Sequence, residues 1–507
     1  MIIHPTGEKA WTNRHETLTV PIDNLFDLAN NNTGAGNEMN DYNDATKGIQ
    51  GIIQEAIDTG KELRVLGGEW SWTKIAATTG ILLNTKPLNL RFTIGEDNVS
   101  PQYKQTPADL FFVQCGVSVK ELTTDLEGRG RSIKTSGASN GQTIAGAMST
   151  GTHGSAIDIG SVADFVVGLH IITSPTEHIW LERKSYPVAS DSFIGALGAT
   201  PTRDDDLFNA ALVSFGSFGF IHGVMIETST IFLYEAHRFR VPLDNNLFNL
   251  METLDFAAAN FLPHGAERPY HFQTLINQYD QDKGAYVNIM YKRPFDPTHT
   301  PPVSPVPDTS PGDDAPAFIG TITQQIPALV PVVINKLVAK MYKPYPKPLI
   351  GTHSEIFGNF TTHGKVFSTA AGIPLAAVST VRKLLLDLNN TDAGPFAGIF
   401  AFRFLKQTKA TLGFTHFDPG CVIELDGVFS KQTQIFYDAF WNALEQQNIP
   451  HSFHWGKMLR LDNSRIRDIY TDTKVDAWLE ARNKILHDAP TKKTFTNDIM
   501  REWGLDG

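Results

Sequence analysis

The sequence predicts an α+β protein built from more than one domain. Its 507 residues exceed what one ordinary hydrophobic core holds, so we expect roughly two to four domains. The first 230 residues alternate strand-length apolar runs with segments of helical spacing, which indicates helices packed on sheets. From about residue 231 the segments lengthen, and a proline-rich stretch at 296–317 predicts an exposed loop, since proline cannot continue a helix or a central strand.

Individual elements of the first part follow from the same patterns. Apolar residues at helical spacing predict helices over 43–59 and 119–127, and Gly128 and Gly130 end the second. Short apolar runs predict strands at 62–66, 81–83, 110–113 and 165–172.

The segment Ile326–Tyr342 is apolar, with lysines on or near one side. The simpler interpretation is a buried helix of the second domain. The alternatives are a lid over an apolar pocket or a helix lying on a membrane surface. No window of about 18 uninterrupted apolar residues occurs, which argues against a transmembrane segment. The N-terminus lacks the apolar stretch of a secretory signal, so we expect a soluble cytoplasmic protein unless a signal has been removed.

Charge and cysteine content exclude several classes of function. The net charge of -11 argues against a globally basic nucleic-acid-binding protein. The two cysteines, Cys115 and Cys421, can form one disulfide at most, so this is no disulfide scaffold. From the net charge we expect no nucleic-acid partner. No group of His, Cys, Asp or Glu has convincing metal-ligand spacing, so we also expect no metal site.

A glycine-rich segment, SGASNGQTIAGAMSTGTHGS at Ser136–Ser155, is the strongest local signal. Small residues let backbone N–H groups approach a ligand, and consecutive N–H groups in turns bind anions such as a diphosphate. A glycine-rich surface loop of no special role is the alternative. The segment is neither a G-x-G-x-x-G fingerprint opening a helix nor a P-loop.

The amino-acid sequence of this segment, together with the preceding VQCGVSVKELTTDLEGRG, resembles the FAD-binding domain (PCMH type) of the vanillyl-alcohol oxidase superfamily. The aldonolactone oxidase, alditol oxidase and type II (flavin-linked) cholesterol oxidase branches look closest. Further matches follow in family order at Gly216–Thr228, His454–Lys457 and 482–505. The resemblance implies a two-domain α+β fold. An FAD-binding domain of residues 1–230 and 441–507 would enclose an antiparallel-sheet substrate domain of 231–440.

The resemblance also implies which residues hold FAD. One diphosphate loop is Leu66, Gly67, Gly68, Glu69, Trp70, Ser71 and Trp72, and the second, with the segment before it, is Ser136, Gly137, Gly146, Ser149, Thr150, Gly151, Thr152, His153, Gly154 and Ser155. Gly219, Ile221 and Val224 would lie near the adenosine, and His454 and Lys457 at the flavin ring. Many relatives tether FAD through a histidine at the position of Trp70, so the resemblance implies FAD held without a covalent bond.

The substrate side is less defined. Ile399–Phe414 alternates as a strand does and carries Arg403 among apolar neighbours. Relatives have a Glu two residues before this Arg, where this chain has Ala401, so the Glu–Arg pair is expected to be broken. Arg403 could stabilise negative charge on a substrate oxygen or extend from a strand edge to solvent.

A second strand, Cys421–Phe429, places Glu424 and Asp426 on one face. A buried carboxylate there could have a raised pKa and act as a base, although a solvated polar face is the simpler interpretation.

The predicted function is an FAD-dependent oxidoreductase that transfers a hydride from a C–H next to an oxygen to flavin. The substrate would be an alcohol, a sterol-like molecule or a lactone. The chain's many aromatic residues and the apolar segment Ile326–Tyr342 favour a bulky apolar substrate. The candidate catalytic residues are Arg403, Lys457, His454 and Glu424. Oxygen is the expected electron acceptor, giving H2O2. The alternatives are a dehydrogenase with another acceptor and an FAD-binding protein without oxidase activity.

Overall fold

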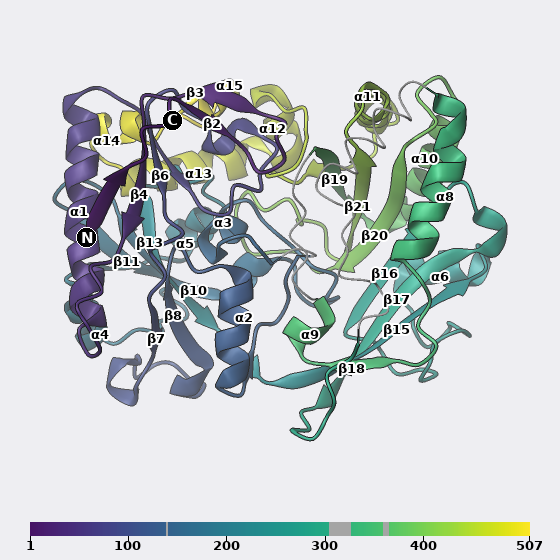
Figure 1. Ribbon diagram of the computed structural model, residues 1–507, viewed down its shortest axis with the longest axis horizontal. Helices are drawn as coiled ribbons and strands as arrows, with labels where there is room; N and C mark the ends of the chain where they lie inside the picture. Colours follow the sequence, from purple (N-terminus) through teal and green to yellow (C-terminus); the bar gives the residue numbers. More distant parts are fainter. Residues whose placement is uncertain (138–139, 304–325, 358–364) are drawn as a thin grey trace.

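Three sheets organise the chain in the computed structural model, which describes residues 1–137, 140–303, 326–357 and 365–507 (Figure 1). A four-stranded sheet has the order β1 (Ile2–Pro5), β4 (Asn24–Ala29), β6 (Ile81–Asn84), β5 (Leu63–Leu66). A six-stranded sheet has the order β12 (Thr200–Arg203), β11 (His178–Glu182), β10 (Val166–Ile172), β13 (Phe220–Glu227), β8 (Leu110–Gln114), β7 (Arg91–Thr93). Two two-stranded sheets are formed by the β2 (Ala10–Thr12) and β3 (Thr19–Pro21) hairpin and by the antiparallel pair β9 (Arg131–Ser132) and β14 (Ser229–Thr230).

The third sheet is antiparallel throughout and has eight strands. Its order is β18 (Leu349–Gly351), β15 (Phe232–Val241), β17 (Ala285–Pro294), β16 (His271–Ile276), β20 (Gly398–Leu405), β21 (Gly420–Val428), β19 (Val366–Pro374), β22 (Ser452–Phe453). The last strand lies beyond the predicted boundary at residue 440, so the C-terminal segment completes this sheet as well as contacting β5 of the first sheet.

Helices cover these sheets. In the first part they are α1 (Glu38–Asp58), α2 (Val119–Gly128), α3 (Ile144–Ser149), α4 (Asp191–Leu197) and α5 (Asp205–Leu212). The middle has α6 (Asn245–Thr253), α8 (Val330–Met341), α9 (His353–Phe357), α10 (Val378–Asn389) and α11 (Lys431–Gln446). The C-terminal segment has α12 (Asn463–Tyr470), α13 (Asp472–Ile485), α14 (Ala489–Thr494) and α15 (Asp498–Glu502).

Local sequence explains where the predicted helices begin. In α2 the Ser118 hydroxyl accepts from the Glu121 N–H at 3.2 Å, and the Glu121 carboxylate accepts from the Ser118 N–H at 2.9 Å. This reciprocal capping box satisfies two backbone donors that a helix start leaves unpaired. Helix α1 buries Ala45, Ile49 and Ile53, which are four residues apart and therefore share one face. The predicted helices and the four predicted strands of the first part are confirmed.

One prediction about the middle of the chain needs correction, and a second holds for the residues that the structure describes. The strand predicted over Ile399–Phe414 ends at Leu405. Beyond it the chain turns, because Thr408 is held by the Asp164 carboxylate of the first part at 2.6 Å and Gly413 bonds back to Ala410. Of the proline-rich stretch, residues 296–303 lie outside helix and strand and are mostly exposed, as predicted, and 304–317 lie outside the described residues.

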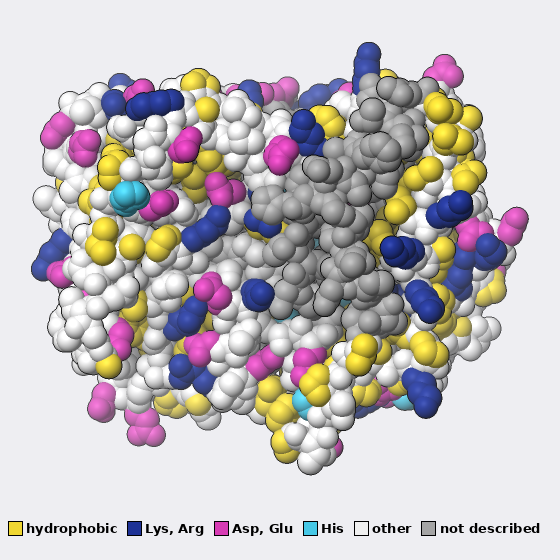
Figure 2. All heavy atoms as spheres, viewed as in Figure 1, with side chains coloured by type: hydrophobic (Ala, Val, Ile, Leu, Met, Phe, Trp, Pro, Cys, Tyr) yellow, Lys and Arg dark blue, Asp and Glu magenta, His cyan; other side chains and the backbone are white. Residues whose placement is uncertain are grey.

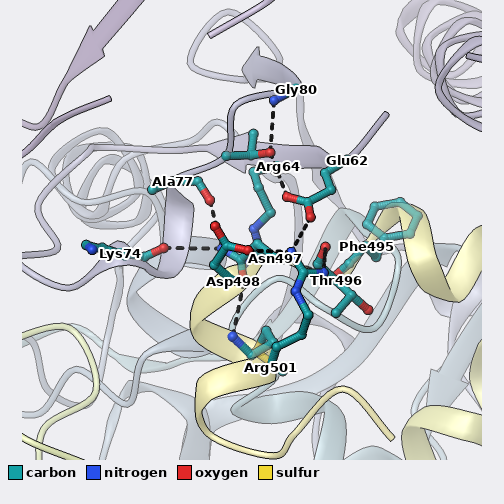
Figure 3. Close-up of polar contacts among 12 residues, drawn as sticks. Glu62, Arg64, Lys74, Ala77, Gly80, Phe495, Thr496, Asn497, Asp498 and Arg501 are labelled. Atoms are coloured by element: carbon teal, nitrogen blue, oxygen red, sulfur yellow. Dashed lines mark hydrogen bonds and ion pairs between the residues drawn. The ribbon is translucent and has the colours of Figure 1, made fainter. Parts of the chain in front are cut away.

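Hydrogen bonds join the C-terminal segment to residues 64–77 of the first part of the chain (Figure 3). The Asn497 amide donates to the carbonyl oxygens of Lys74, Ile75 and Ala77 at 3.2, 3.1 and 2.8 Å. The buried Arg64 guanidinium donates to the carbonyl of Phe495 at 3.2 Å. These long-range bonds join the C-terminal helices to the first sheet, which supports the proposed division in which residues 441–507 complete the FAD-binding domain.

Candidate functional site

A cavity of about 740 Å³ lies between the first part of the chain and the eight-stranded sheet. This volume is within the range of cofactor and ligand sites. One wall consists of the two predicted diphosphate loops, and another of strands β15, β16, β17, β20 and β21. Helix α8 closes a third side through Ile334, Leu337, Val338 and Met341, so this segment is a helix that covers an apolar part of the cavity. Its outer face is exposed at Val332, so it is not wholly buried.

Most of the predicted FAD residues line this cavity. They are Leu66, Gly67, Gly68, Glu69, Trp70, Ser71, Trp72, Gly137, Gly146, Ser149, Thr150, Thr152, His153, Gly219, Ile221, His454 and Lys457. Five do not: Ser136, Gly151, Gly154, Ser155 and Val224. The Ser136 hydroxyl instead contacts His353 Nε2 at 2.8 Å, and Ser155 and Val224 are fully buried behind the cavity wall.

Three segments far apart in sequence converge on the cavity. The Trp72 N–H donates to the Gly456 carbonyl at 2.8 Å, and the Thr73 hydroxyl donates to the Trp455 carbonyl at 2.9 Å. A Cβ added at Gly456 would lie 3.4 Å from both Ser71 Oγ and Thr150 Oγ1. The H-W-G-K turn is thus packed between the two diphosphate loops, with Gly456 at van der Waals distance from both.

The first loop shows features of a ligand-binding turn. Glu69 has a φ of 63°, the left-handed region that non-glycine residues rarely occupy. Its carboxylate is fixed by Trp11 Nε1 at 2.8 Å and by Lys86 Nζ at 2.7 Å. Two buried polar atoms that line the cavity, Trp70 Nε1 and Gln142 Oε1, have no hydrogen-bond partner among the described residues. Such atoms favour a bound polar ligand. The two glycine-rich loops and these unsatisfied polar atoms therefore fit bound FAD, whose diphosphate would lie beside the loops.

A charged cluster stands on the sheet side of the cavity. The Glu424 carboxylate forms an ion pair with Arg403 and another with Lys457 Nζ at 2.6 Å. His153 Nε2 lies 3.7 Å from the same carboxylate, and Asp426 is 3.8 Å from Lys457. Glu424 is 4% exposed, so the simpler interpretation of a solvated polar face is wrong for this residue and holds only for the exposed Asp426.

The Glu–Arg pair expected to be broken is formed in another way. Ala401 and Glu424 are direct cross-strand partners on β20 and β21. Side chains in this relation have Cβ atoms about 5 Å apart and share one face of the sheet. The carboxylate missing at position 401 is therefore supplied from the neighbouring strand. Strand β20 is central, and the Arg403 side chain is 12% exposed, so Arg403 does not extend from a strand edge to solvent.

The electrostatics of the cluster correct the expectation of a raised carboxylate pKa. Burial alone would raise the pKa of Glu424, but Arg403 and Lys457 outweigh burial and hold this pKa well below its usual range. Glu424 is thus an anion that fixes two cations, and its basicity is low.

Two histidines near the cluster are neutral. Burial lowers the pKa of His153 to about 4, with Arg403 and Lys457 opposing Glu424. Burial, followed by Lys457, lowers the pKa of His454 well below its usual value. His454 Nδ1 accepts from the Gly456 N–H at 3.0 Å, which leaves the proton on Nε2. His454 can therefore donate one hydrogen bond without carrying a charge.

Several lining residues carry no signal in the sequence. Trp11 and His15 come from the β2–β3 hairpin, and the His15 ring stacks on Trp72 at 3.8 Å between centroids. Arg238 on β15 also lines the cavity, and its guanidinium lies 5.5 Å and 4.6 Å from the ring centroids of Tyr342 and Tyr345. The hairpin is short and polar, and β15 gives no local motif, so only the folded chain brings these residues to the site.

The loops, the cavity and the cation cluster define an FAD-binding oxidoreductase. The resemblance to the vanillyl-alcohol oxidase superfamily of FAD-linked oxidoreductases is confirmed by comparison with known proteins. Residues 44–182 match a sequence family described as an FAD binding domain. The L-gulono-1,4-lactone dehydrogenase of Mycobacterium tuberculosis is 22% identical over 454 residues, which cover 89% of this chain and 92% of the relative.

Other relatives match over a smaller part. The putative D-arabinono-1,4-lactone oxidase of Neurospora crassa is 28% identical over 214 residues, which cover 42% of this chain and 33% of the relative. Among solved structures, the cholesterol oxidase from B. sterolicum has a TM-score of 0.71 at 14% identity and covers 99% of this chain and 97% of its own. The predicted fold class, FAD as cofactor and oxidoreductase function are confirmed. Within the described residues, every helix is too short or too polar to cross a membrane.

Proposed function

We propose that the protein holds FAD non-covalently and oxidises a C–H bond next to an oxygen in a bulky, largely apolar alcohol, sterol-like molecule or lactone. The observation that carries this proposal is the position of the Arg403–Glu424–Lys457 cluster. It lies where the predicted FAD loops meet the apolar wall of the cavity. Bound FAD supplies the hydride acceptor.

The chain's own residues bind and polarise the substrate oxygen in this proposal. Arg403 and Lys457 place two positive charges in a mostly buried site, where they stabilise negative charge that develops on that oxygen. Lys457 also lies in the turn predicted to face the flavin ring, so it stabilises negative charge on that side. Glu424 keeps both cations in place and is a weak candidate for the base. His454 supports the site by donating its Nε2–H.

The substrate class rests on helix α8 and the strands facing it. Leu337 and Met341 contribute aliphatic surface to the cavity, and Ile399 and Val428 do so from β20 and β21. A free sugar would bury many hydroxyl groups against this surface without partners, which costs free energy for each unsatisfied group. A substrate with one reactive oxygen and a large apolar body matches this distribution better.

The absence of a covalent bond to FAD rests on Trp70. Trp70 lines the cavity at the position where many relatives carry the tethering histidine. An indole cannot form that bond. Acid precipitation of the purified protein tests this point, because FAD held only by contacts is released to the supernatant. A yellow pellet would contradict it and would direct attention to His15 and His153.

Oxygen is our proposed acceptor, and a dehydrogenase is the second candidate. The relative matched along nearly the whole chain is named a dehydrogenase, which favours the second candidate. The test is anaerobic mixing of the FAD-loaded protein with sterols, aliphatic alcohols, polyols and aldonolactones, followed by air. Bleaching by an apolar alcohol or lactone supports the proposal. Rapid recovery of colour with peroxide supports the oxidase, and slow recovery supports the dehydrogenase.

The controls separate binding from chemistry. Arg403→Ala should keep FAD and lose bleaching, whereas Lys383→Ala, at an exposed ion pair on α10, should change neither. If no compound of the panel bleaches the flavin, the hydride-transfer proposal fails, and a protein that binds FAD without oxidase activity becomes the better account.

A further inference from the structure

Two histidines and a glutamate converge on the second domain, away from the flavin cavity. Glu235 and His237 are two residues apart on β15, so their side chains share one face of the sheet. His264 comes from the segment between α6 and β16. His237 Nε2 lies 2.8 Å and His264 Nε2 lies 2.6 Å from the same oxygen, Glu235 Oε1. The three ligand-type atoms all lie within 4.8 Å of one another.

This group has the composition of a zinc site. Zn²⁺ in proteins takes imidazole nitrogens and carboxylate oxygens, often two His and one Glu with water as the fourth ligand. Tetrahedral bonds of about 2.0–2.1 Å place neighbouring ligand atoms roughly 3.3 Å apart. The two imidazole nitrogens therefore need to move outward from Glu235 by roughly half an ångström. The His264 side chain is 35% exposed and lies in a loop, so it can make this adjustment and leave room for water.

The charges around the group are compatible with a cation. Arg293 Nε contacts the other oxygen of Glu235, Oε2, at 2.6 Å and leaves Oε1 to the histidines. The Arg293 guanidinium is also bound by Glu267, at 2.6 and 3.2 Å. With two carboxylates and one guanidinium, the group keeps one excess negative charge when both imidazoles are neutral. Hydrogen bonds from Arg293 would orient the ligating carboxylate, as partners of metal ligands commonly do.

We propose that Glu235, His237 and His264 bind a divalent first-row metal ion, with Zn²⁺ as the best match, and that the ion fastens the segment after α6 to β15. The site is separate from the flavin chemistry, because Arg238, the next residue on β15, has its side chain on the other face and lines the cavity. No sequence spacing indicated this site, since His264 joins the β15 pair only in the fold.

Calorimetric titration of the chelator-treated, FAD-loaded protein with ZnCl2 tests the proposal. We expect one equivalent of Zn²⁺ to bind and each of His237→Ala and His264→Ala to weaken binding by at least about 100-fold. The matched control is His299→Ala, since His299 pairs with Glu355 at 2.8 Å without a second histidine in the pair. This variant should bind Zn²⁺ as the parent does.

Two further measurements guard against misfolded variants. Co²⁺ added to the unaltered protein should give the visible bands of a four-coordinate site, and Zn²⁺ should remove them. Hydrogen exchange of residues 254–267 should slow when Zn²⁺ is added. The proposal is overturned if Zn²⁺ does not bind saturably, if it binds equally to the folded His237→Ala and His264→Ala variants, or if exchange in this segment is unchanged. In those cases the three side chains form only a hydrogen-bonded group.

Discussion

Removing Glu424 should cost both stability and hydride transfer. Glu424→Ala leaves Arg403 without its carboxylate and Lys457 with only the exposed Asp426 at 3.8 Å, and the side chains of these two cations are only 12% and 14% exposed. Breaking a buried ion pair in this way costs about 3–5 kcal/mol. With an unfolding entropy of about 2 cal/mol/K per residue, 3 kcal/mol corresponds to roughly 3 °C in Tm if the whole chain unfolds as one unit. The rate of flavin reduction should fall about 100-fold, the usual effect of losing one preorganised electrostatic group.

A carboxylate moved to the neighbouring strand should repair part of this damage. Ala401 faces Glu424 across the strands, so Ala401→Glu combined with Glu424→Ala returns a carboxylate beside Arg403. Overpacking against α8 costs about 1–3 kcal/mol, so we expect partial recovery. The assays are the Tm and anaerobic flavin reduction of the parent, both single variants and the double variant. The reasoning is refuted if Glu424→Ala is as stable and active as the parent, or if the double variant is no better than Glu424→Ala.

Three other predictions concern the cofactor, the pocket and pH. Trp70→His should leave flavin in the acid-precipitated pellet, and a colourless pellet would count against the loop assignment. Leu337→Ser should raise KM for apolar substrates about tenfold while FAD content stays unchanged, and an unchanged KM would place the substrate elsewhere. The pKa of His416 is lowered to about 4, chiefly by burial. As pH drops, His416 is therefore protonated in the unfolded state before it is protonated in the folded state. The free energy of unfolding accordingly falls as pH drops from 6.5 towards 4. His416→Phe should flatten this fall, measured as Tm against pH, whereas an equal slope would refute the pKa assignment.

Much of the first part of the chain could be predicted from sequence because its signals are local. Glycine-rich turns, a Ser–Glu capping box and runs of apolar residues each specify their own structure within a few positions. The H-W-G-K turn at His454–Lys457 and most loop residues accordingly line the cavity as the resemblance implied. Ser155 and Val224 do not, because a motif identifies a segment but not which of its side chains face inward.

The charged cluster could not be predicted because it depends on strand register. Sequence shows Ala401 and Glu424 in two separate strands, and nothing local places them opposite each other. The low pKa of Glu424 likewise follows from contacts with Arg403 and Lys457 that exist only in the fold. His15 reaches the cavity through long-range packing for the same reason, whereas a helix over an apolar pocket is one of the alternatives for Ile326–Tyr342.

The most direct test of the account is the flavin content of the purified protein before and after acid precipitation. We expect one FAD per chain, visible as yellow colour, with all of it released to the supernatant and a colourless pellet. A protein that contains no flavin and takes up none when FAD is added would contradict the central claim that this cavity is an FAD site.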